Sequence, residues 1–214
     1  MNKEMAERIP LSKLTKAANA SAAFARVAKR IEAGEVFIYP TETIYGIGGR
    51  ADSDEVKRRI IKAKKRKSNN PIILLAGSKK VFDNFGIVFP KAGLFLAKYF
   101  WPGQLTLAVP FRNKKGTAAV RVSSHPFITK LYKILTIPIF STSANISGRD
   151  YLNSPDEIFS IFESKIDFMI DAGVLPSSLP STIVTILNDN KIELAREGVI
   201  GTQKILSAFV KRYF

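Results

Sequence analysis

Residues 39–49 read Tyr-Pro-Thr-Glu-Thr-Ile-Tyr-Gly-Ile-Gly-Gly and directly follow the apolar run Val36-Phe37-Ile38. Hydroxyls, one carboxylate and three glycines after an apolar run are typical of a strand that ends in a tight polar loop. Glycine lets the backbone come close to a ligand, because it has no side chain. We therefore predict a strand over residues 35–40 that opens into a ligand-binding loop.

A cluster of cations stands next along the chain. Residues 57–67 hold eight Lys and Arg and no acid, and Ser-Asn-Asn-Pro follows at 68–71. Lys64 and Arg66 are two positions apart and cannot share a helix face, but just past a helix end both can turn toward one phosphate chain. A solvated basic helix end explains the same pattern, so this segment alone leaves two interpretations open.

Helices and strands mix irregularly outward from these segments. Periodicity and capping signals predict helices over residues 19–33, 52–66, 79–85, 91–100, 126–135, 154–164 and from 202 onward, with Asp52, Ser154 and Thr202 as three of the N-caps. Apolar runs predict strands over residues 35–40, 72–76, 105–111, 118–122, 137–140, 168–170, 181–187 and 192–195. Turn residues at 113–116 join strands 105–111 and 118–122 as a hairpin, and those at 188–190 join strands 181–187 and 192–195. Hairpins and helical crossovers together predict an α/β fold: an open, twisted mixed sheet with flanking helices.

Length and composition favour one domain over residues 1–214 with a full hydrophobic core, since 46% of the residues are hydrophobic. The chain has no cysteine, which excludes disulfides and thiolate chemistry, and its single His125 excludes a His-rich metal site. We expect no metal site of the protein's own. No apolar run approaches the roughly 18 residues that a membrane span requires, so we expect a cytoplasmic protein.

The net charge points to an anionic partner. Lys and Arg total 33 against 18 acids, giving +15 and a pI near 10.0, which suits nucleic acid, nucleotides or other polyanions. A lysine-rich proteome with a solvated surface explains the bulk charge equally well. No general-base constellation stands out, and Glu42 is the one acid of the first loop. Phosphoryl and nucleotidyl transfer fit this pattern, because they can proceed by positioning and charge neutralisation.

Three further places are candidates for ligand contact. Residues 141–148, Ser-Thr-Ser-Ala-Asn-Ile-Ser-Gly, follow a predicted strand and could bind a base, a phosphate or an amino acid. A serine-rich turn that satisfies its own backbone explains them too. Arg121 lies within a predicted strand, where its guanidinium either faces solvent or holds a carboxylate, and Arg196 near a strand end is equally ambiguous.

Taken together, seven motifs in order resemble the YrdC-like threonylcarbamoyl-AMP synthase family across roughly residues 20–200. The motifs are Tyr-Pro-Thr-Glu-Thr-Ile-Tyr-Gly-Ile-Gly (39–48), Lys-Lys-Arg with Ser68 and Asn-Pro (64–71), Pro-Gly-Gln-Leu-Thr (102–106), Arg-Val with His-Pro (121–126), Ser-Ala-Asn-Ile-Ser-Gly (143–148), Ser-Thr-Ile-Val (181–184) and Arg-Glu-Gly (196–198). Each motif alone is weak, but an ordered set of this kind seldom arises by chance.

The resemblance implies an open twisted α/β fold with one basic concave face. It also implies an enzyme that makes L-threonylcarbamoyl-AMP from L-threonine, bicarbonate and ATP, with release of pyrophosphate and with Mg²⁺ brought in by ATP. The product would pass to the tRNA threonylcarbamoyl-transfer complex, which modifies adenosine 37 of tRNAs that read codons beginning with A.

Matching motifs also imply roles for individual residues. Threonine would be contacted by Thr43, Arg121, Ser141 and Ser181. The ATP phosphates would be met by Lys64, Arg66 and Asn70, of which Lys64 and Arg66 would be catalytic. The rest of the nucleotide would be surrounded by Thr117, Ser143, Asn145 and Arg196.

The chain departs from the family pattern at three positions. Leu75 stands where a His is frequent, Lys67 where a Pro is frequent, and Tyr151 where a Ser is frequent. The family includes short paralogues with similar motifs, so the alternative is a YrdC-like protein without synthase activity that binds double-stranded RNA or tRNA. Such a protein would recognise A-form shape and phosphates without ATP, weakly and with a steep salt dependence.

Overall fold

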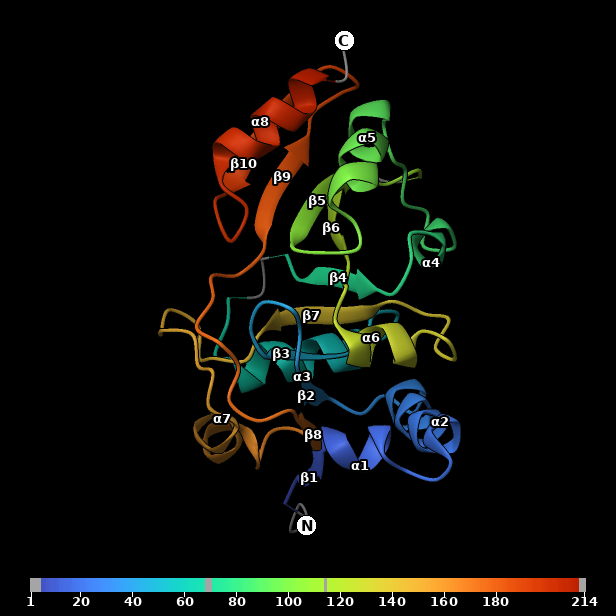
Figure 1. Cartoon of the computed structure of the whole chain (residues 1–214), viewed down its shortest axis with the longest axis vertical. Helices are drawn as coiled ribbons and strands as arrows, with labels where there is room; N and C mark the ends of the chain where they lie inside the picture. The colour runs from blue at the N-terminus through green and yellow to red at the C-terminus, as the bar shows by residue number, and fades with distance from the viewer. Residues whose placement is uncertain (1–4, 68–70, 114, 212–214) are drawn as a thin grey trace.

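A single sheet of mixed strand direction runs through the molecule (Figure 1). The computed structural model describes residues 5–67, 71–113 and 115–211, and ten strands of this part pair in the order β1-β8-β2-β3-β7-β4-β6-β5-β9-β10. The strands are β1 (Glu7–Pro10), β2 (Phe37–Tyr39), β3 (Gly46–Arg50), β4 (Ile73–Ala76), β5 (Leu105–Pro110), β6 (Thr117–Val122), β7 (Ile139–Ser143), β8 (Phe168–Asp171), β9 (Thr182–Ile186) and β10 (Ile192–Arg196). The predicted α/β class with a mixed, open twisted sheet is confirmed.

Helices flank the sheet along its whole length. They are α1 (Leu11–Thr15), α2 (Ala20–Glu32), α3 (Asp54–Ala63), α4 (Lys80–Asp83), α5 (Lys91–Phe100), α6 (Pro126–Leu131), α7 (Pro155–Phe162) and α8 (Thr202–Val210). Parallel pairs (β1/β8, β2/β8, β4/β6, β5/β9) and antiparallel pairs (β2/β3, β3/β7, β4/β7, β5/β6, β9/β10) occur in the same sheet. The antiparallel pairs include the predicted hairpin of β5 and β6.

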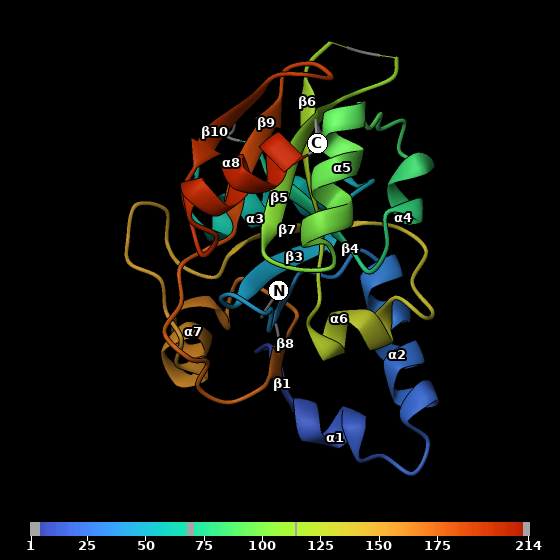
Figure 2. The ribbon, with the colours of Figure 1, turned by 45° about the horizontal axis from the view of Figure 1, so that its top comes forward.

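The hydrophobic core is divided among the faces of the sheet. Around β2, β7 and β8, one apolar cluster joins α1, α2 and α6 to the sheet, and a second joins α3 and α7 to it. Around β5, β6 and β9, a third cluster joins α4, α5 and α8 to the sheet. Figure 2 shows α5 and α8 lying over β5 and β9. The part of the sheet around β5, β6 and β9 therefore has one apolar face, which α4, α5 and α8 cover, and an opposite face that can carry polar groups.

Strand alternation places apolar and polar side chains on these two faces. In β6, Ala118, Val120 and Val122 belong to the cluster under α5 and α8, whereas Arg121 lines a cavity. In β9, Val184 belongs to that cluster and Ile183 lines the cavity. Successive residues of a strand point to opposite faces, so the alternating sequence itself builds the floor of the site.

The glycines of the first motif form a strand, not the loop that the sequence predicts. Gly46–Arg50 is β3, paired with both β2 and β7. A Cβ atom on Gly48 would lie 1.9 Å from the carbonyl oxygen of Phe140, and one on Gly46 would lie 3.1 Å from the Tyr39 ring. The glycines therefore mainly allow close packing inside the sheet, and the ligand loop narrows to residues 40–45.

Two predicted N-caps differ in the structure. The N-cap of α3 is Ser53, which accepts a hydrogen bond from the Val56 amide (3.3 Å). Asp52 is unavailable for this role, because Arg50 binds both of its carboxylate oxygens (2.6 and 2.8 Å). At α8 the N-cap is Gly201, and the Thr202 amide donates to Glu197 instead.

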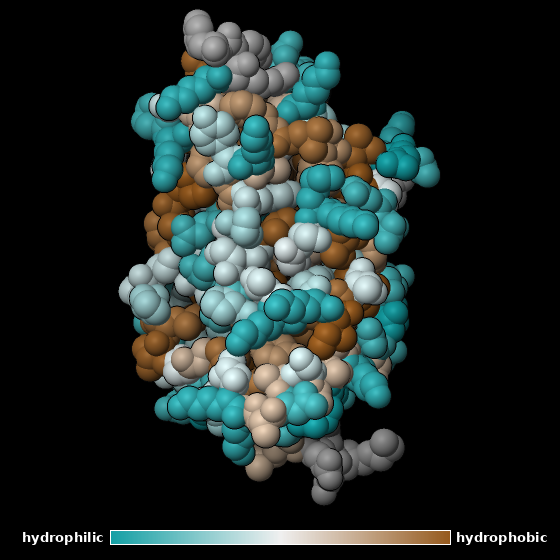
Figure 3. All heavy atoms as spheres, turned by 45° about the vertical axis from the view of Figure 1, so that its right-hand side comes forward, coloured by the Kyte–Doolittle hydropathy of each residue, from teal (hydrophilic) through white to brown (hydrophobic). Residues whose placement is uncertain are grey.

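The N-terminal elements β1 and α1 were not predicted. The segment from Glu7 to Thr15 mixes charged and apolar residues without a clear period, and β1 forms because it pairs with β8, far along the chain. Figure 3 shows hydrophilic side chains spread over one face of the molecule, with apolar patches between them. None of the helices described is long and apolar enough to cross a lipid bilayer.

Candidate functional site

A cavity of about 670 Å³ lies over the polar face of the sheet. Residues after β2, after α3, after β7 and before β9 surround it, so loops far apart in the sequence meet there. Its described lining contains five cations (Lys64, Arg66, Arg121, Arg149 and Arg196) and one acid, Asp150. This volume lies within the range typical of small-ligand sites, and the excess of cations favours an anionic ligand.

The end of α3 directs two of these cations. Lys65 has a positive φ of 51°, its amide donates to Lys62 O (3.1 Å), and the Arg66 amide donates to Ile61 O (3.0 Å). These two bonds form a Schellman motif, in which a residue in the left-handed conformation ends the helix. The reversal at Lys65 separates the paths of the Lys64 and Arg66 side chains.

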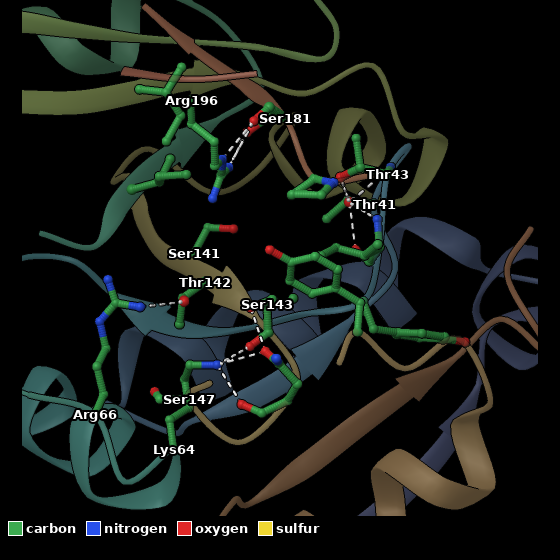
Figure 4. Close-up of a pocket in the computed structure, with 18 of the residues that line it drawn as sticks. Thr41, Thr43, Lys64, Arg66, Ser141, Thr142, Ser143, Ser147, Ser181 and Arg196 are labelled. Carbon is green, nitrogen blue, oxygen red and sulfur yellow. Dashed lines mark hydrogen bonds between the residues drawn. The ribbon is translucent and has the colours of Figure 1, made fainter. Parts of the chain in front are cut away.

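Arg66 reaches into the cavity from one side. Its guanidinium donates from Nη1 to Thr142 Oγ1 (3.3 Å) and from Nη2 to Pro71 O (2.9 Å). In the described part of the chain its buried Nε has no hydrogen-bond partner, and burial lowers the pKa of Arg66. Figure 4 shows Arg66 and Arg196 on two sides of the cavity with Ser141 between them.

Lys64 lies at the same cavity but is 1% exposed. Its Nζ donates to Asn145 O (2.6 Å), to Asn145 Oδ1 (3.2 Å) and to Ser143 O. Burial lowers the pKa of Lys64 to about 7, and the nearby charge of Arg66 contributes to the shift. The three oxygen acceptors favour the protonated form. Lys64 thus contacts the loop after β7, whereas the resemblance implies that it meets phosphates.

The segment after β7 is held in shape by its own polar groups. Ser141–Ser143 belong to β7, so only residues from 144 onward form the predicted loop. Ser143 Oγ donates to Asn145 Oδ1 (2.5 Å), and Asn145 Nδ2 donates to Arg149 O (2.5 Å). We call Arg66 with Thr142, Ser143 and Asn145 the Arg66 side of the cavity.

The opposite side is built around a buried ion pair. Arg121 is 4% exposed, donates from Nη1 to Thr43 Oγ1 (3.4 Å) and places its Nε 3.8 Å from Glu42 Oε1. That distance allows charge attraction but exceeds a hydrogen bond, and both atoms are buried without a hydrogen-bond partner among the described residues. Ser123 Oγ donates to Glu42 Oε2 (2.5 Å). We call Thr43, Glu42, Arg121 and Ser123 the Arg121 side.

Arg196 and Ser181 close the cavity from β9 and β10. Arg196 donates from Nε and Nη2 to Ser181 O (3.2 and 2.8 Å). Ser181 Oγ shares a hydrogen bond with the buried Thr106 hydroxyl (2.8 Å). Burial lowers the pKa of Arg196. Figure 4 shows Arg196 and Ser181 above the cavity, so Arg196 contributes positive charge to the roof of the cavity.

The structure brings most of the predicted site residues to this one cavity. Those that line it are Thr43, Lys64, Arg66, Arg121, Ser141, Ser143, Asn145, Ser181 and Arg196. Thr117 does not line it, because it lies at the exposed hairpin end of β6 opposite Pro110. Asn70 falls outside the described residues. Arg121 does not face solvent, since its guanidinium is buried and lines the cavity; that it holds a carboxylate stays a prediction.

The contact between Glu42 and Ser123, next to Arg121, was not predicted from the sequence. Glu42 and Ser123 meet over 81 positions of sequence, a separation that no local pattern reveals. Leu75, at the position where a His is frequent, is fully buried in the apolar cluster under α2 and α6 and does not line the cavity. Tyr151 is 45% exposed and lines the rim. Lys67 is exposed.

Within the described residues no group of three His, Cys, Asp or Glu could hold a metal ion. His125 serves a local structural role, because its Nδ1 accepts from the Phe127 amide (3.2 Å) at the start of α6. Burial lowers the pKa of His125, against a smaller opposing effect of Glu42. The side chains available for chemistry in the described lining are therefore cations, hydroxyls, the Asn145 amide and the Asp150 carboxylate.

The chain resembles known proteins in sequence and in fold. The profile of the Sua5/YciO/YrdC family, described as "Telomere recombination", matches residues 29–198. The chain belongs to this family. A Pyrococcus abyssi threonylcarbamoyl-AMP synthase is 34% identical over 162 residues, which cover 72% of this chain and 48% of that protein. The present chain thus spans about half the length of that relative.

Two further relatives extend the match. A Methanocaldococcus jannaschii protein is 34% identical over 183 residues, covering 83% of this chain and 86% of its own length. The crystal structure of P. abyssi Sua5 in complex with L-threonine superposes with a TM-score of 0.82 at 28% identity, over 96% of this chain and 61% of that one. The fold and family are therefore shared with threonylcarbamoyl-AMP synthases.

Proposed function

We propose that this protein is an L-threonylcarbamoyl-AMP synthase, which joins L-threonine, bicarbonate and ATP and releases pyrophosphate. One observation carries the proposal: Arg121 with Thr43, and Arg66 with Ser143 and Asn145, face a single cavity. A small amino acid and a triphosphate can then lie next to each other. Threonylcarbamoyl-adenylate would serve the threonylcarbamoyl modification of tRNA adenosine 37 after transfer to the tRNA-modifying complex.

The Arg121 side suits the amino acid. Its guanidinium provides paired N–H donors for a carboxylate, and the Thr43 hydroxyl next to it can accept or donate. Ser141 and Ser181 add hydroxyls along the floor and roof. The known complex of P. abyssi Sua5 with L-threonine supports an amino acid as ligand of this fold.

The Arg66 side suits the nucleotide. Arg66 and Arg196 are half-buried guanidinium groups on two sides of the open space in Figure 4, where they can neutralise phosphate charge. Ser143 and Asn145 supply the polar groups for the nucleoside. Mg²⁺ would enter as part of the Mg-ATP substrate, bound by the phosphates.

The reaction would proceed by positioning. Bicarbonate loses hydroxide to give CO₂, the neutral threonine amine adds CO₂ as a carbamate and loses a proton, and the hydroxide and proton combine to water. A carbamate oxygen then attacks the α-phosphorus of ATP, and the bond from that phosphorus to pyrophosphate breaks. The cations screen the negative charges of the two reactants and of the leaving group. No side-chain nucleophile is required, in agreement with the residues that line the cavity.

A pyrophosphate assay tests the proposal. Purified protein with Mg-ATP and bicarbonate should release pyrophosphate only when L-threonine is added, together with threonylcarbamoyl-adenylate detected by mass spectrometry. Pyrophosphate release that is indifferent to threonine would contradict it. Titration with ATP and with a short RNA duplex at two salt concentrations separates an enzyme from a module that only binds RNA.

A further inference from the structure

We propose that Lys64 is a positioning residue that builds the nucleoside-binding segment 143–147, and that phosphate binding on this side of the cavity belongs to Arg66. The inference rests on the proposed function, because it concerns the nucleotide of the same reaction. It assigns different roles to two cations that are only two residues apart.

The first argument is the number of donors. A lysine ammonium has three N–H groups, and Lys64 directs them at three oxygens, Asn145 O, Asn145 Oδ1 and Ser143 O. The side chain is 1% exposed. A phosphate oxygen could bind this ammonium only by displacing one of these acceptors, and a displaced backbone carbonyl would be left without a partner.

The second argument is that Lys64 contacts the segment with its backbone as well. The Ser147 amide donates to Lys64 O (3.0 Å). The Lys64 ammonium therefore contacts the beginning of the segment, and the Lys64 carbonyl contacts its end. Asn145 extends these contacts to the residues after the segment, since its Nδ2 donates to Arg149 O (2.5 Å). Figure 4 shows the Lys64 side chain directed at Ser143, with Ser147 beside it.

The third argument is the contrast with Arg66. Arg66 is half-buried, contacts Thr142 and Pro71 through its two terminal nitrogens, and keeps a buried Nε without a partner among the described residues. The left-handed Lys65 between the two cations sends their side chains along different paths. Each terminal nitrogen of Arg66 carries two N–H groups and makes one hydrogen bond to a described residue. Arg66 thus retains donor capacity for a ligand, whereas Lys64 does not.

The roles can be separated by titrating adenosine, AMP, ADP and ATP into the full chain. A phosphate ligand contributes more as phosphates are added, whereas a residue that shapes the nucleoside segment contributes equally to all four ligands. We therefore expect Lys64→Met to raise the Kd of all four by a similar factor of about ten or more, equivalent to roughly 1.4 kcal/mol or more. Arg66→Met should leave adenosine binding unchanged and weaken ATP most.

Control variants separate the role of Lys64 from the loss of a positive charge and from a failure to fold. Lys62→Met removes the same charge from the exposed face of α3 and should change none of the four Kd values beyond a small, salt-sensitive effect on ATP. If Lys64→Met does not fold, Lys64→Gln keeps two N–H donors and serves in its place. In the wild-type protein, the Lys64 ammonium signal in NMR spectra should respond alike to adenosine and to ATP.

The outcomes are distinct. A loss in Lys64→Met that grows with phosphate number, or an ammonium signal that moves only with ATP, would overturn the inference and leave the proposed function intact. Absence of adenosine binding by the wild-type protein would also overturn it. If the wild-type protein binds adenosine but releases no threonine-dependent pyrophosphate, the proposed function fails and the four titrations still decide the role of Lys64.

Discussion

The two sides of the cavity are built in different ways. On the Arg121 side the charged groups lie on or beside strands, the guanidinium is 4% exposed, and Glu42 is 3.8 Å away as its counter-ion. On the Arg66 side the groups lie just after a helix and a strand, Arg66 is half-buried, and its contacts are a hydroxyl and a backbone carbonyl. One side is fixed before any ligand arrives, and the other retains free donor capacity.

This difference matches what two kinds of ligand require. A small amino acid offers few contacts, so a preformed site with a neutralised cation gives selectivity at a low cost in ordering. A triphosphate is flexible and strongly charged, so it is better bound by cations that can adjust their position along its phosphate groups.

The largest effect is expected on the Arg121 side. Arg121→Met leaves the Glu42 carboxylate buried without its cation, and breaking a buried pair in this way typically costs about 3–5 kcal/mol of unfolding free energy. Denaturant unfolding measures this cost, and calorimetric titration should show that threonine binding is lost.

A double variant separates stability from binding. Arg121→Met combined with Glu42→Gln removes both charges, so much of the stability should return while threonine still fails to bind. A double variant that binds threonine as the wild type does would show that the guanidinium is no part of the amino-acid site.

A smaller effect is expected on the Arg66 side. Arg66→Ala should weaken ATP binding by about 1.5–3 kcal/mol, the range for hydrogen bonds to charged groups, with little change in stability. Arg58→Ala is the matched control, because it removes the same charge from the exposed face of α3. An ATP titration of Arg66→Ala that coincides with the control removes Arg66 from the nucleotide site.

The smallest effect concerns the residue between the two cations. Lys65 has a left-handed backbone, which is unfavourable for residues with a side chain and readily adopted by glycine. Lys65→Gly should therefore stabilise the fold by up to about 1 kcal/mol in denaturant unfolding. A loss of stability would indicate that the Lys65 side chain makes contacts that outweigh the backbone strain.

The sequence was informative where local patterns suffice. The period of apolar residues located α2, and the polar turn with Gly116 between two apolar runs located the hairpin of β5 and β6. The ordered motifs located most of the cavity lining. Turn composition misled at 46–49, because glycines that look like a loop are there for packing against Tyr39 and Phe140. Polar residues 141–143 likewise proved to be the end of a strand.

Other features depend on tertiary contacts and leave no local signal. Glu42 becomes the partner of Arg121 and Ser123 only after strands far apart in the sequence have paired. The hydrogen-bond acceptors of the Lys64 ammonium are in Ser143 and Asn145, which lie 79 and 81 positions further along the chain. For the same reason, nothing in the hairpin sequence shows that Thr117 lies away from the cavity.

The tight contact at Gly48 limits how this cavity can change. A single methyl group at that position would meet the Phe140 carbonyl at 1.9 Å, so only glycine fits there while β3 and β7 stay paired at their present separation. The polar loop before β3 and the segment after β7 are therefore carried by two neighbouring, paired strands. Room for a bulkier amino acid would therefore have to come from shorter side chains on the walls, since moving β3 and β7 apart would break the backbone hydrogen bonds that pair them.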